Sequence, residues 1–466
     1  MKKIFNKIIF MQRFFKTKIL FFVTALTIVT INKASAQDQQ ASTYSFTLEQ
    51  AIDYAIQNQP ALLNAAIDQQ IAQKRVNELK GVGLPQISGS VDGKKFIEIP
   101  TVVIPAIAFG GPEGVVQTAQ FGLEYEASAG LSASQLVLDG SYIVGLKASK
   151  TYVELSRKNY QQSKIEAALQ VSKAYYNVLV NAERMDLLNA NVERIKKLRD
   201  DTKAFYDNGF VEKIDFDRID ITYNNIVTEK QKTEKLLELG KLLLKYQMGM
   251  DMNANLALTD DLKNIKFDES LPADQQTDYT KRIEYSALQT TQRLQELDLK
   301  KNQYQYLPSL VLYGELSTHA YRFDFNFFDG NKGWYPTAVV GATLSIPIFD
   351  GFQKNARIQQ SKLNLKKIEN SFKSLEQGIA LETATAKVNL QNSISSLETQ
   401  RKNRELAEEV TRVSKIKYDQ GVGSNLEVTT AETSLKEAET NYYSALFDAL
   451  VAKIDYQKAT GTLIKN

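Results

Sequence analysis

The acidic side chains are the residues of this sequence whose spacing could do chemistry. Four of them follow the two copies of a short Tyr-Asp-x-Gly segment: Asp215, Asp217, Asp220 and Glu427. Paired carboxylates can hydrolyse polymers by general acid and base catalysis, but one of the two needs an apolar surrounding that raises its pKa. No acid in the sequence stands in such a context, so we expect no hydrolase. A solvated charged face is the plainer explanation of these four residues.

The composition excludes most other chemistry. The 466 residues include no cysteine, so we expect no disulfide, no thiol nucleophile and no cysteine-ligated metal. The one histidine, His319, rules out a multi-histidine metal site. The sequence also lacks a Walker A motif, a nucleophile elbow and a metal box. We therefore expect neither an enzyme nor a cofactor.

The same series of sequence features occurs twice in the chain. It consists of Leu-Pro, an alternating run, Asp-Gly, a long helical stretch, a Tyr-Asp-x-Gly turn and a second helix. Matching segments are Leu84-Pro85 with Leu307-Pro308, Leu136–Gly140 with Pro347–Gly351, and Tyr206–Tyr223 with Tyr418–Leu435. A repeat of this period means one supersecondary unit used twice. We predict a first repeat over 37–250, a linker or equatorial segment over 251–282, and a second repeat over 283–466.

The first 36 residues predict a secretory signal peptide. A basic segment precedes an apolar run from Ile19 to Ile31, and Ala34-Ser35-Ala36 forms a cleavage site. Without the seven basic residues of this segment the formal charge falls from +3 to about −4, so the charge does not indicate nucleic-acid binding. No segment of the mature chain approaches the ~18–20 apolar residues of a spanning helix. If the exported chain enters a membrane, it does so as strands of a closed barrel.

Each half contains two strand candidates separated by a loop. They are Gln86–Asp92 with Phe121–Leu131, and Leu310–Leu316 with Val340–Ile348. Apolar residues alternate with polar or small ones along them, which places one face in apolar surroundings and the other in water or a polar lumen. One such hairpin alone would fit the edge of a soluble sheet. Two equivalent hairpins in an exported, cysteine-free chain favour membrane strands.

The loops between these strands differ most between the halves. Prolines at 100, 105 and 112 argue against a regular strand through the apolar loop 94–119, whose role stays open. The loop 317–336 is rich in aromatic residues and holds the sole Trp334. These aromatics fit either an interfacial girdle or a loop that packs on itself.

Two long helices and two return helices are predicted. Residues 141–205 and 352–418 lack proline, and the return helices span 214 to about 246 and 426 to about 458. Gly209 and Gly421 stand where a helix end needs a positive φ. Apolar residues step by three and four, as in a coiled coil. The series are Val171, Tyr175, Val178, Ala182, Met185, Leu188, Val192 and Ile195, and then Ile368, Phe372, Leu375 and Ile379. We expect them to hold helices together.

Four strands cannot close a barrel, because small barrels need about eight. The inference is an oligomer whose subunits each donate four strands and four helical segments to shared cylinders. Three copies would supply twelve strands.

The sequences of several segments resemble those of the TolC-like outer-membrane efflux family, whose members are called outer membrane factors. The segments are TLEQAIDYAIQNQPAL at Thr47–Leu62, GLPQIS at Gly83–Ser88, SIPIFDGFQKNARIQQSK at Ser345–Lys362, and YDQGVGSNLEVTTAE at Tyr418–Glu432. The resemblance covers residues 44–461. It implies an α+β membrane protein of a Gram-negative bacterium, a homotrimer with a twelve-stranded β-barrel in outer-membrane lipid and a long periplasmic α-helical barrel. It also implies a periplasmic adaptor (membrane fusion protein) and an inner-membrane pump as partners, and no nucleic acid.

The same resemblance implies roles for the two turns. Family members close the periplasmic end with acidic rings, and Glu427 matches the first acid of that pattern. Thr430 stands where a second acid is found, so Asp215, Asp217 and Asp220 are candidates for the missing charge. The tips that would meet the adaptor are Gly209, Phe210 and Val211 in the first repeat, and Gly421, Val422, Gly423 and Ser424 in the second.

The leading hypothesis is a passive exit duct of a tripartite efflux or type I secretion system, with the energy supplied by the pump. The alternative is a structural periplasmic or surface coiled-coil protein, such as an adhesin, that forms no pore. The two predicted hairpins argue against that alternative. The exported substrate and the class of pump are not encoded in these signals.

Overall fold

The computed structural model describes residues 43–262 and 278–464. The predicted signal peptide, 1–36, and residues 263–277 of the predicted linker lie outside the described residues. Contacts divide the chain into a small unit, Met1–Tyr44 with Asn253–Ala257, and a large unit, Ser45–Met252 with Leu258–Asn466. The described residues of the small unit are Thr43, Tyr44 and Asn253–Ala257, which contribute to a two-stranded sheet of β1 (Thr43–Phe46) and β6 (Asn255–Leu258). All other elements belong to the large unit.

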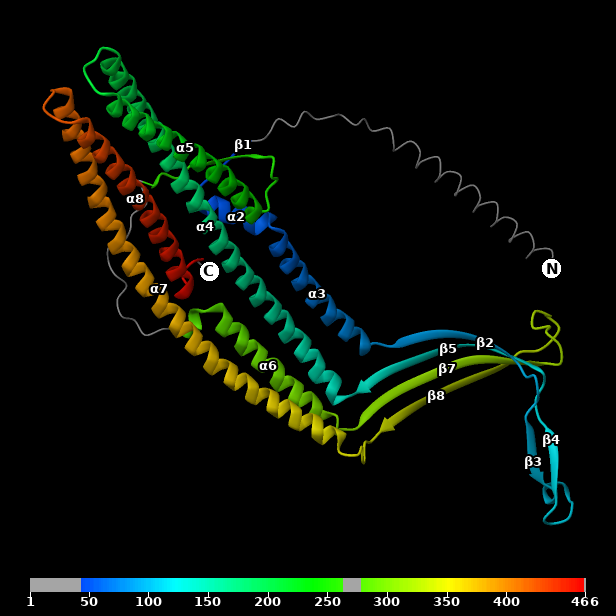
Figure 1. Cartoon of the computed structure of the whole chain (residues 1–466). Coiled ribbons are helices and arrows are strands. Elements are labelled where there is room, and N and C mark those ends of the chain that lie inside the picture. Colours follow the sequence, from blue (N-terminus) through cyan, green and yellow to red (C-terminus); the bar gives the residue numbers. More distant parts are fainter. Residues whose placement is uncertain (1–42, 263–277, 465–466) are drawn as a thin grey trace. The chain divides into compact units, whose positions relative to one another are not determined.

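The large unit contains a four-stranded antiparallel sheet in the order β2-β5-β7-β8 (Figure 1). Its strands are β2 (Gln86–Lys95), β5 (Tyr125–Leu138), β7 (Ser309–Arg322) and β8 (Tyr335–Ser345). The two predicted hairpins are therefore present, and the pairing of β5 with β7 joins them. β5 begins four residues later than the sequence predicts, because Gly122, with φ +133°, interrupts the chain before it.

The two faces of this sheet differ in polarity. Directly paired residues of neighbouring strands lie on the same face. One face is apolar and comprises, among others, Ile87 and Val91 of β2, Ala129, Leu131 and Ala133 of β5, Leu310, Leu312 and Leu316 of β7, and Ala338, Val340, Ala342 and Leu344 of β8. The other face carries mainly polar residues, including Ser88, Ser90, Asp92, Glu126, Ser128, Ser132, Glu315, Ser317, Thr337 and Thr343. Most of the apolar face is exposed in a single copy of the chain.

Two long helices follow the sheet, each starting at an Asp-Gly signal. α4 spans Gly140–Asp207 and α7 spans Gln353–Asp419, close to the predicted ranges. Asp139 accepts a hydrogen bond from the Tyr142 N–H at 2.9 Å, and Asp350 accepts one from the Lys354 N–H at 2.9 Å. The repeated aspartate thus satisfies a backbone donor in the first turn of each long helix.

The return helices are α5 (Lys213–Met248) and α8 (Asn425–Ala459). α5 runs beside α4 and α8 beside α7, as Figure 1 shows. Three buried clusters hold them. Leu188, Val192 and Ile195 of α4 pack on Ile226 of α5. Leu198, Ile219 and Val428 join α4, α5 and α8, and Val180 packs with Tyr443, Leu446 and Leu450 across α4 and α8.

The predicted apolar series is buried unevenly. In α4, six of its eight residues are buried, and Ala182 and Met185 are half-buried. In α7, only Ile379 is buried, while Ile368, Phe372 and Leu375 are half-buried. The core of one copy therefore centres on α4 and α8.

The four predicted helical segments are present, and three further helices were not predicted. The structure adds α2 (Leu48–Asn58), α3 (Pro60–Val82) and α6 (Ile283–Tyr304). α3 and α6 pack on α4, and α6 also packs on α7. The start signals are local: Thr47 and Gln50 form a capping box, and Pro60 occupies the first turn of α3. No helix in the described ranges combines the length and the apolar character needed to cross a membrane.

The expectation that loop 94–119 contains no regular strand is also wrong. β3 (Thr101–Pro105) and β4 (Val116–Gln120) pair antiparallel, with the short helix η1 (Ala106–Phe109) after β3. Pro105 is tolerated because it is the last residue of its strand and the donor toward the partner segment is the next residue, whose N–H (Ala106) donates to the Val115 carbonyl at 2.8 Å.

The end of α5 generates a testable prediction. Gly249 has φ +69°, and a Cβ there would lie 2.6 Å from the Asn58 carbonyl oxygen at the junction of α2 and α3. We expect Gly249→Ala to destabilise the fold by roughly 2 kcal/mol, from left-handed strain and the clash.

Gly145→Ala is the matched control, because nothing lies within 4 Å of its Cβ position in α4. It should be neutral or slightly stabilising. The measurement is the midpoint temperature of thermal unfolding in detergent, followed by the helical circular dichroism signal. Equal midpoints for both variants would contradict the proposed packing.

Candidate functional site

Both predicted turns have the same helix-ending geometry. The Phe210 N–H donates to the Phe205 carbonyl at 2.8 Å, and the Val422 N–H donates to the Lys417 carbonyl at 3.0 Å. Gly209 and Gly421 have φ values of +77° and +74°, which confirms the prediction that each ends its helix in the left-handed region. The repeated Tyr-Asp-x-Gly segment is therefore a device for reversing the chain.

Gly423 has a structural role that the sequence does not reveal. A Cβ at this position would lie 2.9 Å from the Lys417 Cβ and 3.0 Å from the Tyr418 backbone nitrogen. Any larger side chain would displace the turn itself. Substitutions at Gly423 are therefore a poor test of contacts made by the tip. Any loss of function could result from distortion of the turn itself.

The side chains at the tips of the turns are exposed and apolar. Phe210 is 79% exposed and Val422 is 76% exposed. The Phe210 ring meets the Phe205 ring edge-on, with centroids 6.5 Å apart. Among the other tip candidates Gly209, Gly421 and Ser424 are exposed, and Val211 is half-buried. The two turns thus present apolar groups where the chain reverses.

Two of the four candidate acids, Asp215 and Glu427, lie in the first turns of the return helices, and Asp217 and Asp220 follow further along α5. Glu427 is exposed, and its N–H donates to the Ser424 hydroxyl at 3.2 Å, so Ser424 caps α8. Asp215 is half-buried and lies 3.9 Å from an Arg218 nitrogen. Asp217 is exposed, and Asp220 accepts a hydrogen bond from Asn224 at 3.3 Å. In one copy Asp215 and Glu427 also stabilise their helix starts, because a negative charge in the first turn opposes the helix dipole.

A buried amide places the two helix starts side by side. Asn425 of α8 donates to the Asp215 backbone carbonyl of α5 at 3.4 Å, and its side-chain oxygen accepts from the Thr429 hydroxyl at 3.0 Å. Asp215 and Glu427 therefore lie on neighbouring helix starts. The structure of one copy places no acid ring, because a ring would be assembled from several copies.

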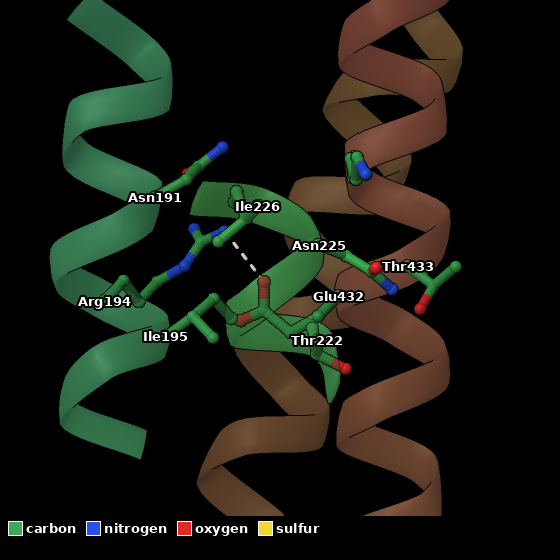
Figure 2. Close-up of a pocket in the computed structure, with 9 residues that line it drawn as sticks. Asn191, Arg194, Ile195, Thr222, Asn225, Ile226, Glu432 and Thr433 are labelled. Atoms are coloured by element: carbon green, nitrogen blue, oxygen red, sulfur yellow. Dashed lines mark hydrogen bonds and ion pairs between the residues drawn. The ribbon is translucent and has the colours of Figure 1, made fainter. Parts of the chain in front are cut away.

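The site that sequence reasoning missed lies about one to three turns further along α8. Arg194 of α4 donates to Glu432 at 2.8 Å, and Asn191 of α4 donates to Glu439 at 2.7 Å. Both glutamates are 5% exposed. Figure 2 shows Arg194 reaching across to Glu432 at a small pocket between α4, α5 and α8, with a volume of about 70 Å³.

Burial changes the acidity of these two glutamates. It raises the pKa of Glu439 to about 7, although the hydrogen bond from Asn191 and the charge of Arg194 oppose the change; Glu408 and Glu432 add to it. Burial also raises the pKa of Glu432, against the opposing charges of Arg194 and Lys415. The expectation that no acid stands in an apolar context is therefore wrong.

The sequence contained a signal for this site. Val428, Glu432, Leu435, Glu439 and Tyr443 step by three and four along α8. Two glutamates thus occupy positions of an apolar stripe. The hydrogen bonds from α4 show that these acids connect α8 to α4. The pocket beside Glu432 is too small for a polymer substrate. In the described ranges no group of three or more histidine, cysteine or acidic residues could hold a metal ion.

Comparison with known proteins identifies the family. The family model described as "Outer membrane efflux protein" matches residues 51–225 and 284–462, which is most of the chain. This chain belongs to the outer membrane efflux protein family. The resemblance drawn from the quoted segments is thereby confirmed.

Relatives of this efflux protein include the outer membrane protein TolC of Escherichia coli strain K12. It is 22% identical over 427 residues, covering 89% of this chain and 82% of TolC. TolC of Vibrio cholerae is 19% identical, covering 91% of this chain and 92% of that protein.

Solved outer-membrane channels share the fold of this efflux protein. The Campylobacter jejuni channel CmeC superposes with a TM-score of 0.71 at 18% identity, covering 90% of this chain and 86% of CmeC. The open Neisseria gonorrhoeae channel MtrE superposes with a TM-score of 0.70 at 20% identity, with 89% of each chain covered. The protein is a TolC-like efflux channel protein of the outer membrane.

The raised pKa of Glu439 in this efflux protein predicts a pH dependence. Between the ordinary value of 4.5 and about 7 the folded chain binds a proton that the unfolded chain releases. Stability should therefore fall as pH rises through this window and level off above it, by up to about 3 kcal/mol. Glu439→Gln should remove this component and be the more stable chain at alkaline pH.

Thermal unfolding of the parent and Glu439→Gln at a series of pH values measures the effect. Glu427→Gln, which changes an exposed acid of the same helix, is the control and should follow the parent. A constant difference between the parent and Glu439→Gln at all pH values would show that Glu439 does not change protonation in this range.

Proposed function

We propose that this protein is the outer-membrane exit duct of a tripartite efflux or type I secretion system. Three copies would share a twelve-stranded barrel in the outer membrane and a periplasmic barrel built from their helices. Transport through it is passive, and an inner-membrane pump, joined by a periplasmic adaptor, supplies the energy. The outer-membrane location and the channel fold of the family support this proposal.

The single observation that carries the proposal is the open four-stranded sheet. β2 and β8 are its edges, and each presents a row of backbone donors and acceptors to solvent in one copy. A long open edge is an aggregation hazard unless another chain covers it. The exposed apolar face is likewise suited to lipid, and the polar face to an aqueous lumen. Pairing β8 of one copy with β2 of the next would cover the open edges. In the closed barrel the apolar face would meet lipid and the polar face would line an aqueous lumen.

The helical turns are the proposed contact with the adaptor. Phe210 and Val422 expose apolar side chains beside backbone held by Gly209 and Gly421. Apolar side chains surrounded by polar ones are typical of surfaces that bind another protein. Gly423 and Ser424 would contribute by keeping the second turn tight and capped.

The acids at the helix starts are the proposed gate. Symmetry around a threefold axis would bring three copies of Glu427 together, with Asp215 as the nearest further acid and Asp217 and Asp220 behind it. Converging like charges attract counter-cations, so a closed end would bind cations.

An adhesin that forms no pore is the competing function, and the exposed apolar face of the sheet argues against it. A chain that remains in water would leave that face uncovered. Catalysis is disfavoured because both buried acids are hydrogen-bonded to α4, and the pocket beside Glu432 has a volume of only about 70 Å³.

Assembly is the first test of the duct. We expect the mature protein to be extracted from outer membranes as a detergent-dependent trimer, because four strands cannot close a barrel. Mass measurement of the protein–detergent complex gives the number of copies. A monodisperse monomer that keeps its strand signal by circular dichroism would exclude the shared barrel.

The adaptor contact is tested at the exposed tip residues. Phe210→Asp and Val422→Asp should abolish export because they place a charge in an apolar contact, while trimer yield stays at the parental level. Leu363→Asp is a matched control, because Leu363 is an exposed apolar residue of α7 distant in sequence from both turns. Unchanged export by both tip variants would exclude the turns from the adaptor interface.

The gate is tested by planar-bilayer recording of the purified protein. A resting duct should show low conductance, cation preference and partial block by multivalent cations. Glu427→Ala should weaken the preference and relieve the block, and Thr430→Asp should strengthen both. Identical selectivity and block in Glu427→Ala would remove this residue from the gate and leave the three aspartates.

A further inference from the structure

The hairpin between β2 and β5 lacks a packing partner within one copy. We call residues 96–121 the arm; it contains β3, η1 and β4. β3 and β4 pair only with each other in the described part of the chain. An isolated two-stranded hairpin is marginally stable in water. A partner that covers it would supply the missing stability.

The surface of the arm is apolar. Ile97 is 99% exposed, and Val103, Ile107, Val116 and Phe121 are also exposed. The arm contains two acids, Glu98 and Glu113, and no basic residue. Many exposed apolar groups with few charges on one short segment mark a surface that another molecule covers.

A second exposed segment joins β7 to β8. We call residues 323–335 the aromatic loop. Phe325 folds back onto Tyr125 of its own β5, with ring centroids 6.1 Å apart, and it also meets Phe327 edge-on. Phe328, in contrast, is 93% exposed, and Tyr335 at the start of β8 is exposed as well. The loop thus packs partly on its own sheet and leaves aromatic surface uncovered.

The strand register places the arm and the aromatic loop at one end of the sheet. Tyr125 pairs with Arg322, and Lys95 pairs with Tyr125, so the arm and the loop both extend from this end. The short connections to α3, α4, α6 and α7 leave from the opposite ends of the strands. Within one copy β2 and β8 are the two outer strands, so β5 and β7 separate them.

Closure of the proposed barrel changes which segments are neighbours. This step rests on the proposed function, in which β8 of one copy pairs with β2 of the next. Paired strands lie about 4.8 Å apart. The aromatic loop that enters β8 is then adjacent to the arm that leaves β2 of the neighbouring copy.

We propose that the arm of each subunit packs on the aromatic loop of the adjacent subunit and latches the barrel at the end away from the helices. The occupant of the apolar arm is thus a second copy of this chain. The surface suits protein better than lipid, because Gln117, Thr118 and Gln120 of β4 are exposed among the apolar residues. Aromatic rings on aliphatic side chains provide the contact.

The absence of native cysteine makes the contact directly testable by cross-linking. Val103→Cys and Phe328→Cys are introduced together into the full chain, and outer membranes are treated with an oxidant or a short bis-maleimide. Each copy then carries one thiol in its arm and one in its aromatic loop, so it can be linked to both neighbouring copies. Most of the monomer should therefore be converted to covalent dimers and trimers on a denaturing gel. The same result is expected with Ile107→Cys in place of Val103→Cys.

Two matched variants and one mass measurement decide the outcome. Val103→Cys with Val422→Cys should not cross-link the arm to a neighbouring copy, because Val422 is also exposed but lies at the turn after α7. Links in Val103→Cys alone would mean that arms meet each other, and would overturn the latch. If the trimer is intact but neither arm variant links to Phe328→Cys, the latch is wrong. The proposed exit duct would be unaffected by this result. A monomer by mass would overturn both.

Discussion

The antiparallel pairing of β5 with β7 is the contact on which the rest of the structure depends. Each half of the chain supplies only a two-stranded hairpin, and such a hairpin is marginal by itself. The pairing, which runs from Tyr125 opposite Arg322 to Leu138 opposite Leu310, merges the hairpins into one sheet with one apolar and one polar face. It also fixes where α4 begins, because this helix follows β5 after a single residue.

Local signals predicted the elements whose ends depend on one or two residues. The aspartates at 139 and 350 begin the long helices, and Gly209 and Gly421 end them, so these boundaries are close to the sequence estimates. Elements that depend on packing were missed. α3 and α6 pack on α4, which is a contact between segments distant in the sequence. β3 and β4 were obscured by prolines that the structure accommodates at a strand end.

The candidate site shows the same division between local and distant causes. The exposed positions of Phe210, Val422 and Glu427 follow from the chain reversal, which the sequence encodes locally. The buried state of Glu432 and Glu439 depends on α4, which is more than 200 residues away in the sequence. Two charges in an apolar stripe were visible in the sequence, but only the fold shows that Arg194 and Asn191 face them. The acid ring remains a prediction because symmetry, and not one chain, would assemble it.

The matched lengths of the helices limit how the chain can change in evolution. α4 and α7 contain 68 and 67 residues, and α5 and α8 contain 36 and 35. Inserting a single residue into one of them would rotate everything beyond it by about 100° and turn the buried stripe toward solvent. Seven added residues would rotate the stripe by only about 20°. Length changes should therefore be tolerated in these helices in steps of about seven residues, balanced between a helix and its antiparallel partner.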